Sequence, residues 1–220
     1  MKVFSMPLPI FKADNAIIFE GIKGSGKSTQ IQIAAEALSK DYSVRVHNSD
    51  GIFPIVSQFR PKPIDSIEAA VQESFFIRFM RWLEPINGDP SQIALIDRFV
   101  LSDLVYFMER LSAMHIGYDG AALRSQMLYP LGINALSDSL TIYIDCYPEI
   151  AQCRVKERPR SDFDINLNRR VRDLYLAQLP FISNKRVIDG SQDKIEIAHQ
   201  INAYIVDYLD RKSCTESISS

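Results

Sequence analysis

The segment Gly21-Ile-Lys-Gly-Ser-Gly-Lys-Ser28 spaces glycines, a lysine and a serine as phosphate-binding loops do, in the pattern G-x-x-x-x-G-K-[S/T]. The glycines let backbone N–H groups turn inward around phosphates, and a helix beginning there adds partial positive charge. Lys27 is expected to reach the β and γ phosphates, and Ser28 to ligate Mg²⁺. The residues expected to bind ATP here are Gly21, Gly24, Ser25, Gly26, Lys27, Ser28 and Thr29.

A second pair of chemically useful residues, Asp97 and Arg98, ends the apolar run Ile93-Ala-Leu-Ile. A carboxylate at the end of a strand beside the loop can organise Mg²⁺ and its waters or accept a proton, and Arg98 can clamp a phosphate. We therefore expect Ser28 and Asp97 to hold the metal, and Lys27, Asp97 and Arg98 to be catalytic. The alternative is that Asp97 caps the next helix and Arg98 is its exposed partner.

Two groups of arginines extend the positive charge. Arg154, Arg158 and Arg160 follow the fourth predicted strand, where a segment closing over ATP needs cations for the transferring phosphoryl group. We expect Arg158 to be catalytic and the other two to bind ATP; the alternative is a solvated basic face. Arg78 and Arg81, three residues apart on an apolar helix, either share a face toward a second anion or form a surface pair.

The elements that must position these residues alternate along the chain. Apolar runs bounded by turn residues predict strands at 16–20, 43–47, 93–97, 140–145 and 185–188. Helical patterns lie at 26–38, 67–83, 101–113, 148–157, 169–179 and 194–208. This alternation predicts a three-layer α/β fold with a parallel sheet, whose ligands bind beyond the carboxyl ends of the strands. We expect one domain over 1–220, a short lid at about 157–168 and a polar, disordered tail at 212–220.

The composition limits the classes of partner. A net charge of −2 lacks the bulk positive charge of proteins that coat nucleic acids. No apolar run approaches the roughly 18 residues needed to span a bilayer, and the start of the chain has no long apolar segment typical of a secretory signal. The three cysteines lack paired metal or redox spacing, which indicates free thiols in a reducing compartment. We expect a cytoplasmic protein without nucleic-acid or membrane partners.

With these motifs assembled, the chain resembles the thymidylate kinase family of nucleoside monophosphate kinases, nearly end to end. Residues 19–29 are similar to its F-E-G-x-D-G-x-G-K-S-T start, and residues 97–102 to its D-R-Y-x-x-S motif. Further similar segments are 141–149, 154–160 (R-x-x-x-R-x-R), 171–176 (V-R-x-x-Y-L) and 187–191. The resemblance implies a P-loop kinase fold with a five-stranded parallel sheet, ATP with Mg²⁺, a nucleoside monophosphate acceptor and a homodimer. It also implies that Gly190 lies near adenine.

The acceptor side departs from that family. Its loop acid, which hydrogen-bonds the acceptor sugar's 3′-hydroxyl, is replaced by Lys23. Asn48-Ser-Asp50-Gly stands in place of its R-E-P turn, and Phe107 in place of a polar residue. A site rejects base analogues only when its own polar groups are in place, so the identity of the base stays open. The residues expected to bind the acceptor are Lys23, Asp50, Phe76, Arg78, Arg81, Arg98, Ser102 and Tyr106.

We predict ATP-dependent phosphoryl transfer to a nucleoside monophosphate, dTMP or a related (deoxy)nucleotide. One alternative is a deoxynucleoside kinase, a related family without the loop acid, in which Asp50 would be the base toward a 5′-hydroxyl. Its E-R-S motif, however, differs from the Asp97-Arg98-Phe99 of this chain. A second alternative is a protein that binds nucleotides without turnover, although Lys27, Asp97 and the lid arginines are all present.

Overall fold

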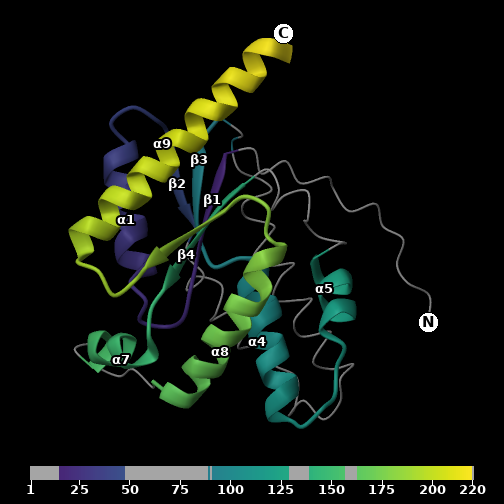
Figure 1. Ribbon diagram of the computed structural model, residues 1–220. Coiled ribbons are helices and arrows are strands. Elements are labelled where there is room, and N and C mark those ends of the chain that lie inside the picture. Colours follow the sequence, from purple (N-terminus) through teal and green to yellow (C-terminus); the bar gives the residue numbers. More distant parts are fainter. Residues whose placement is uncertain (1–14, 48–88, 90, 129–138, 157–162, 220) are drawn as a thin grey trace.

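The computed structural model describes residues 15–47, 89, 91–128, 139–156 and 163–219 (Figure 1). All strands of the sheet run parallel, in the order β2-β3-β1-β4-β5. The strands are β1 (Ala16–Glu20), β2 (Val44–His47), β3 (Ile93–Asp97), β4 (Leu140–Asp145) and β5 (Lys185–Asp189). Each lies within one residue of its predicted bounds. The predicted five-stranded parallel sheet is confirmed.

The helices in the described ranges, with one 3₁₀ turn, are α1 (Lys27–Leu38), α4 (Val100–Ala113), α5 (Gly120–Leu128), α7 (Pro148–Lys156), α8 (Ile165–Gln178), η2 (Leu179–Phe181) and α9 (Lys194–Ser219). Helix α5 was not predicted, because its short sequence GAALRSQML has no clear apolar face. The predicted helix at 67–83 lies outside the described residues. No helix within the described ranges is both long and apolar enough to cross a membrane.

Two hydrophobic cores flank the sheet, because alternate residues of a strand point to opposite faces. Ile17 and Phe19 of β1 join the core covered by α1 and α9, whereas Ala16 and Ile18 join the core covered by α4 and α8. Figure 1 shows these two pairs of helices on opposite sides of the strands. The predicted three-layer arrangement is therefore confirmed.

Helix α8 begins four residues before the predicted start. The Asp164 carboxylate caps it by accepting hydrogen bonds from the backbone N–H groups of Asn166 (2.9 Å) and Leu167 (3.0 Å). Residues 165–168 of the predicted lid form the first turn of α8, and residues 157–162 lie outside the described part of the chain, so the lid stays a prediction.

The predicted disorder of 212–220 is also corrected, since α9 continues to Ser219. Composition alone suggested a tail, but the helix is anchored upstream by Ile201, Ile205 and Tyr208 in the core. An ion pair of 2.7 Å between Arg211 and Asp207, one turn apart, supports its extension.

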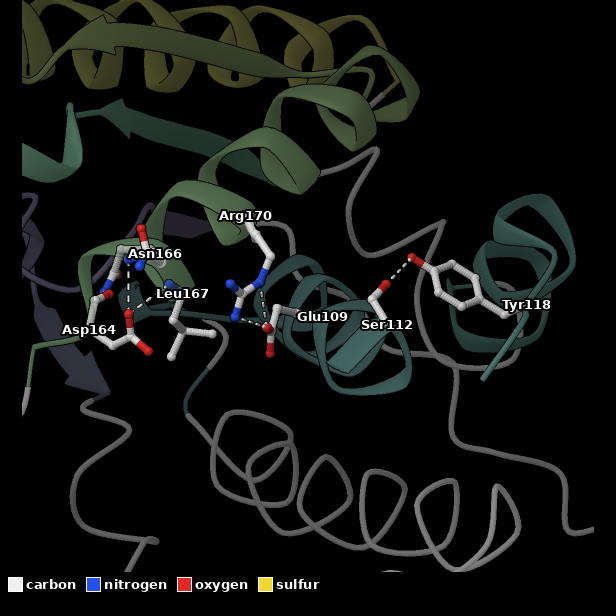
Figure 2. A network of polar contacts seen from close by, with 8 residues as sticks. Glu109, Ser112, Tyr118, Asp164, Asn166, Leu167 and Arg170 are labelled. Carbon is white, nitrogen blue, oxygen red and sulfur yellow. Dashed lines mark hydrogen bonds and ion pairs between the residues drawn. The ribbon is translucent and has the colours of Figure 1, made fainter. Parts of the chain in front are cut away.

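Polar contacts hold α8 against α4 (Figure 2). Nε and Nη2 of Arg170 donate to Oε1 of Glu109 at 3.0 and 2.7 Å. Farther along α4, the hydroxyls of Ser112 and Tyr118 lie 3.3 Å apart, joining α4 to the segment that precedes α5. The Arg170–Glu109 pair thus links the two helices that carry Ser102 and Tyr175.

Candidate active site

The phosphate loop connects β1 to α1 in a conformation that requires glycine. Gly24 and Gly26 have φ values of 81° and 99°, in the left-handed region that side chains rarely adopt. A Cβ at Gly24 would lie 2.7 Å from both the carbonyl oxygen of Ala151 and Cγ2 of Val155. Helix α7 therefore packs directly against the loop, and no side chain fits between them.

Lys27 is 5% exposed and its ammonium is folded into the loop. Its Nζ donates to the carbonyl oxygens of Gly21 and Ile22, both at 2.9 Å, and to Oγ of Ser25 at 3.4 Å. Burial, together with the nearby charge of Arg98, lowers the pKa of Lys27 to about 7. These neutral oxygens are weaker partners for an ammonium than phosphate oxygens, so an anion in the loop would compete for it.

Ser28 and Asp97 meet at the carboxyl ends of β1 and β3, whose register pairs Phe19 with Asp97. Oγ of Ser28 donates to Oδ2 of Asp97 at 3.1 Å. The second oxygen, Oδ1 of Asp97, is buried and has no hydrogen-bond partner within the described part of the chain. A hydroxyl and a carboxylate oxygen without a partner form a donor set that suits Mg²⁺.

Asp97 does not cap α4, the alternative role considered for it. That role belongs to Glu20, which is 0% exposed at the end of β1. Its Oε1 accepts hydrogen bonds from the backbone N–H groups of Phe99 (2.9 Å) and Ser102 (3.2 Å). Its Oε2 accepts from the hydroxyls of Ser102 and, at 3.1 Å, Tyr175. Burial raises the pKa of Glu20, which these hydrogen bonds and the charge of Arg98 lower in part.

Arg98 contacts the same hydroxyls of Ser102 and Tyr175 that contact Glu20. Its backbone is left-handed, with φ of 65°. Its Nη1 lies 3.4 Å from both the Ser102 and Tyr175 oxygens, and its guanidinium carbon lies 5.2 Å from the centre of the Tyr106 ring. Burial opposes its charge, but Tyr106, Tyr175, Glu20 and Asp97 more than offset this, so the pKa of Arg98 is raised.

Arg154 of α7 reaches the loop from the other side. Its Nη1 donates to the carbonyl oxygen of Ser25 at 3.4 Å. A cleft of about 430 Å³ opens beside it, lined by Gly24, Ser25, Gly26, Thr29, Gln30, Arg154, Val155, Lys194 and Ile197. Gly190 follows β5 at the same edge of the sheet, and its N–H donates to the carbonyl oxygen of Asp145 at 2.6 Å.

An ion pair missing from the predicted site lies nearby. Nε and Nη2 of Arg172 donate to the two carboxylate oxygens of Asp145 at 2.7 and 2.8 Å. The guanidinium of Arg172 also lies 4.4 Å from the centre of the Tyr147 ring. The pair fixes α8 to the turn between β4 and α7. Both residues stand in segments that resemble the kinase family, so the signal was present in the sequence.

The structure therefore gathers most of the predicted residues that it describes. Lys27, Ser28, Asp97, Arg98, Ser102, Tyr106 and Arg154 lie at the carboxyl edge of the sheet. Lys23 is exposed on the loop, and Phe107 is part of the core. The predicted residues outside the described part of the chain are Asp50, Phe76, Arg78, Arg81, Arg158 and Arg160.

Curated relatives match most of the chain, although no protein-family model matches it. It is 29% identical over 194 residues to a probable thymidylate kinase of Pyrobaculum aerophilum, covering 84% of this chain and 93% of the relative. It is 24% identical over 206 residues to the thymidylate kinase of Staphylococcus haemolyticus (88% and 98% covered). It is 28% identical over 213 residues to that of Ruegeria pomeroyi (89% and 96% covered).

Solved structures share the fold. A deoxyadenosine kinase from M. mycoides with bound dCTP superimposes with a TM-score of 0.60 at 17% identity, covering 87% of this chain and 99% of that one. The same enzyme with bound dATP gives a TM-score of 0.59 at 14% identity, with 84% and 96% covered. Together with the curated relatives, these matches confirm the predicted resemblance. The chain is similar to thymidylate kinases over most of its length and shares the fold of these kinase structures, which supports a divergent, thymidylate kinase-like nucleotide kinase.

Proposed function

We propose that the chain transfers the γ-phosphoryl group of ATP to the phosphate of a nucleoside monophosphate, dTMP or a related (deoxy)nucleotide. An acceptor phosphate oxygen attacks the γ-phosphorus, the bond from that phosphorus to the β–γ bridging oxygen breaks, and ADP leaves. The observation that carries the proposal is that Lys27, Ser28, Asp97 and Arg98 lie together at one edge of the sheet. The similarity to thymidylate kinases over most of the chain supports the choice of acceptor.

On the donor side, Lys27 would leave its backbone partners for the β and γ phosphates, while the loop N–H groups bind the other phosphate oxygens. Ser28 and Asp97 would hold Mg²⁺, which supplies charge neutralisation at the β and γ oxygens. We assign Arg154 and Gly190 to the ATP site, and Arg158 and Arg160 to the segment that covers it. The arginines would offset the negative charge of the ATP phosphates locally, because the chain as a whole carries a net charge of −2.

Replacing Gly24 with alanine is expected to weaken ATP binding at least tenfold, because left-handed strain of about 1–3 kcal/mol adds to the clash with α7. Calorimetric titration with a non-hydrolysable ATP analogue measures the change. Gly117→Ala is the matched control, since a Cβ there meets nothing within 4 Å. Equal affinities of Gly24→Ala and the wild type would show that the loop does not hold the phosphates.

ATP consumption measured with and without a panel of nucleosides and nucleoside monophosphates tests the function itself. The proposal expects turnover with at least one monophosphate. Turnover with nucleosides alone would favour the alternative of a deoxynucleoside kinase. The fold is compatible with it, because the deoxyadenosine kinase structures share the fold of this chain. No acceptor-dependent turnover would favour a non-catalytic nucleotide-binding protein.

The exposed Lys23 occupies the position of the sugar-binding acid in the kinases that the chain resembles. We expect the wild type to use dTMP poorly and Lys23→Asp to raise kcat/KM for dTMP by about 10- to 100-fold relative to other acceptors. This gain in kcat/KM corresponds to one added hydrogen bond to a charged group, which is worth about 1.5–3 kcal/mol. Lys40→Asp makes the same charge change at an exposed position after α1 and is the control. Efficient wild-type use of dTMP, with no gain from Lys23→Asp, would contradict the role of Lys23.

A homodimer and a cytoplasmic location, both expected from the sequence, remain part of this proposal. They follow from the resemblance and the composition, and size measurements in solution would test the first.

A further inference from the structure

The best-connected buried acid in the described part of the chain is one that the proposed reaction does not use. Glu20, Ser102 and Tyr175 are at most 1% exposed, and they come from β1, α4 and α8. Every hydrogen bond recorded to the Glu20 carboxylate comes from a donor on α4, its N-cap or α8. A buried carboxylate that accepts this many hydrogen bonds restrains the positions of the groups that donate them.

In this network the hydrogen bonds are donated from Arg98 toward Glu20. The hydroxyl of Ser102 donates to Oε2 of Glu20, and the single proton of the Tyr175 hydroxyl is shared between Oγ of Ser102 at 2.6 Å and Oε2 at 3.1 Å. Lone pairs of both hydroxyl oxygens then face Nη1 of Arg98 at 3.4 Å. The hydrogen bond between the two hydroxyls links them into one chain of donors that ends at the carboxylate. Acid and arginine attract each other through these hydroxyls without a direct ion pair between them.

This arrangement leaves part of the guanidinium unused. Within the described part of the chain, Arg98 donates only through Nη1. A direct bidentate pair, such as that between Arg172 and Asp145, would have consumed the Nε–Nη2 edge. The indirect arrangement keeps that edge for an external anion, with a guanidinium already oriented by Tyr106 and its left-handed backbone.

We propose that Glu20, acting through the hydroxyls of Ser102 and Tyr175, is a positioning residue that orients Arg98 toward the phosphate of the acceptor. This inference rests on the proposed function, because it takes the anion at Arg98 to be the acceptor phosphate. Glu20 and Tyr175 themselves need not touch the substrate. Their effect is to reduce the conformational freedom that Arg98 loses on binding.

The substitution Glu20→Gln tests this role because it keeps the shape and reverses the polarity. The amide oxygen takes the two backbone N–H groups, so the amide NH₂ faces Ser102 and Tyr175 and donates to them. Their hydroxyl protons then turn toward Arg98 and repel it. We expect the Kd of dTMP to rise about tenfold, with Kd values of thymidine and of a non-hydrolysable ATP analogue within about twofold of wild type.

A double-mutant cycle separates positioning from mere stability. If Glu20 acts through Arg98, the roughly tenfold effect of Glu20→Gln on dTMP binding disappears in an Arg98→Met background. If Glu20 only caps α4, the effect persists there and extends to thymidine, and the proposal is wrong. Calorimetric titration measures each Kd, and urea unfolding reports the stability of each variant.

Tyr175→Phe provides a second route, should Glu20→Gln not fold. It removes one hydroxyl and leaves both backbone contacts of Glu20 in place, so we expect the Kd of dTMP to rise several-fold. Tyr118→Phe, which loses only its contact with Ser112, is the control. Unchanged dTMP affinity in Tyr175→Phe would show that Glu20 does not act on Arg98 through these hydroxyls.

The outcomes for the function and for this inference differ. If the wild type binds dTMP through Arg98 but phosphorylates no nucleoside monophosphate of the panel, the proposed function fails and the positioning role stands. If the wild type binds dTMP no more tightly than thymidine, Arg98 holds no acceptor phosphate and the positioning role fails. If dTMP is phosphorylated and the cycle is additive, only the positioning role is wrong.

Discussion

Lys27→Ala is expected to reduce kcat by at least about 10²- to 10³-fold, the cost of removing one preorganised charge from a phosphoryl-transfer site. Among the described residues, its buried ammonium donates only to loop atoms, two of them carbonyl oxygens at 2.9 Å, so its charge lies within the phosphate loop. Single-turnover kinetics with ATP and the best acceptor of the panel would measure the loss in the chemical step.

The fold should tolerate this change. Burial lowers the pKa of Lys27 to about 7, which means that the folded, ligand-free protein does not favour the charged form. Loss of its hydrogen bonds is therefore offset by relief of desolvation, and we expect the free energy of unfolding to change by less than about 1 kcal/mol.

Lys185→Ala is the matched control for that loss of activity. Its Nζ donates to the carbonyl oxygen of Ile182 at 2.9 Å, at the start of β5 and so at the opposite edge of the sheet. It should retain wild-type kcat. A Lys27→Ala variant that kept more than about a tenth of wild-type kcat would show that this loop is not the catalytic one.

The sequence predicted the sheet and the donor side well because both rest on local signals. Buried parallel strands form short, almost wholly apolar runs, and β1, β3 and β4 were predicted to the residue. The loop pattern fixes Lys27 and Ser28 through spacing alone, and Asp97 was identified by its place at the end of an apolar strand. The 3.1 Å contact between Ser28 and Asp97 then follows from the pairing of β1 with β3.

The buried network could not be predicted in the same way. Glu20 and Tyr175 are 155 positions apart, and their contact exists only because α8 packs on α4. Both residues stand in segments that resemble the kinase family, but nothing in the spacing of these segments indicates that the two side chains meet. The start of α8 was missed for a different reason. Asn166 and Asn168 are poor helix formers, and the cap that overrides them comes from Asp164.

Asp97→Asn is expected to reduce kcat about 10²-fold and to raise the Mg²⁺ concentration needed for half-maximal rate. The amide keeps the size of the side chain but lacks the charge that would hold the cation through the unpartnered Oδ1. Ser28→Ala should also raise the Mg²⁺ requirement, and the double variant should lose less than the product of the two single losses, because both act on one ion.

Asp119→Asn is the control for this loss of charge, since its carboxylate accepts from the N–H of Ala121 at 2.8 Å, in a surface turn before α5. Rates measured over a range of Mg²⁺ concentrations at saturating ATP distinguish the roles of Asp97. A variant whose rate recovers with excess Mg²⁺ has lost metal affinity, whereas an unrecoverable loss of kcat indicates that Asp97 also accepts a proton. An Asp97→Asn variant that changed only the KM of the acceptor would refute both roles and make this carboxylate part of the acceptor pocket.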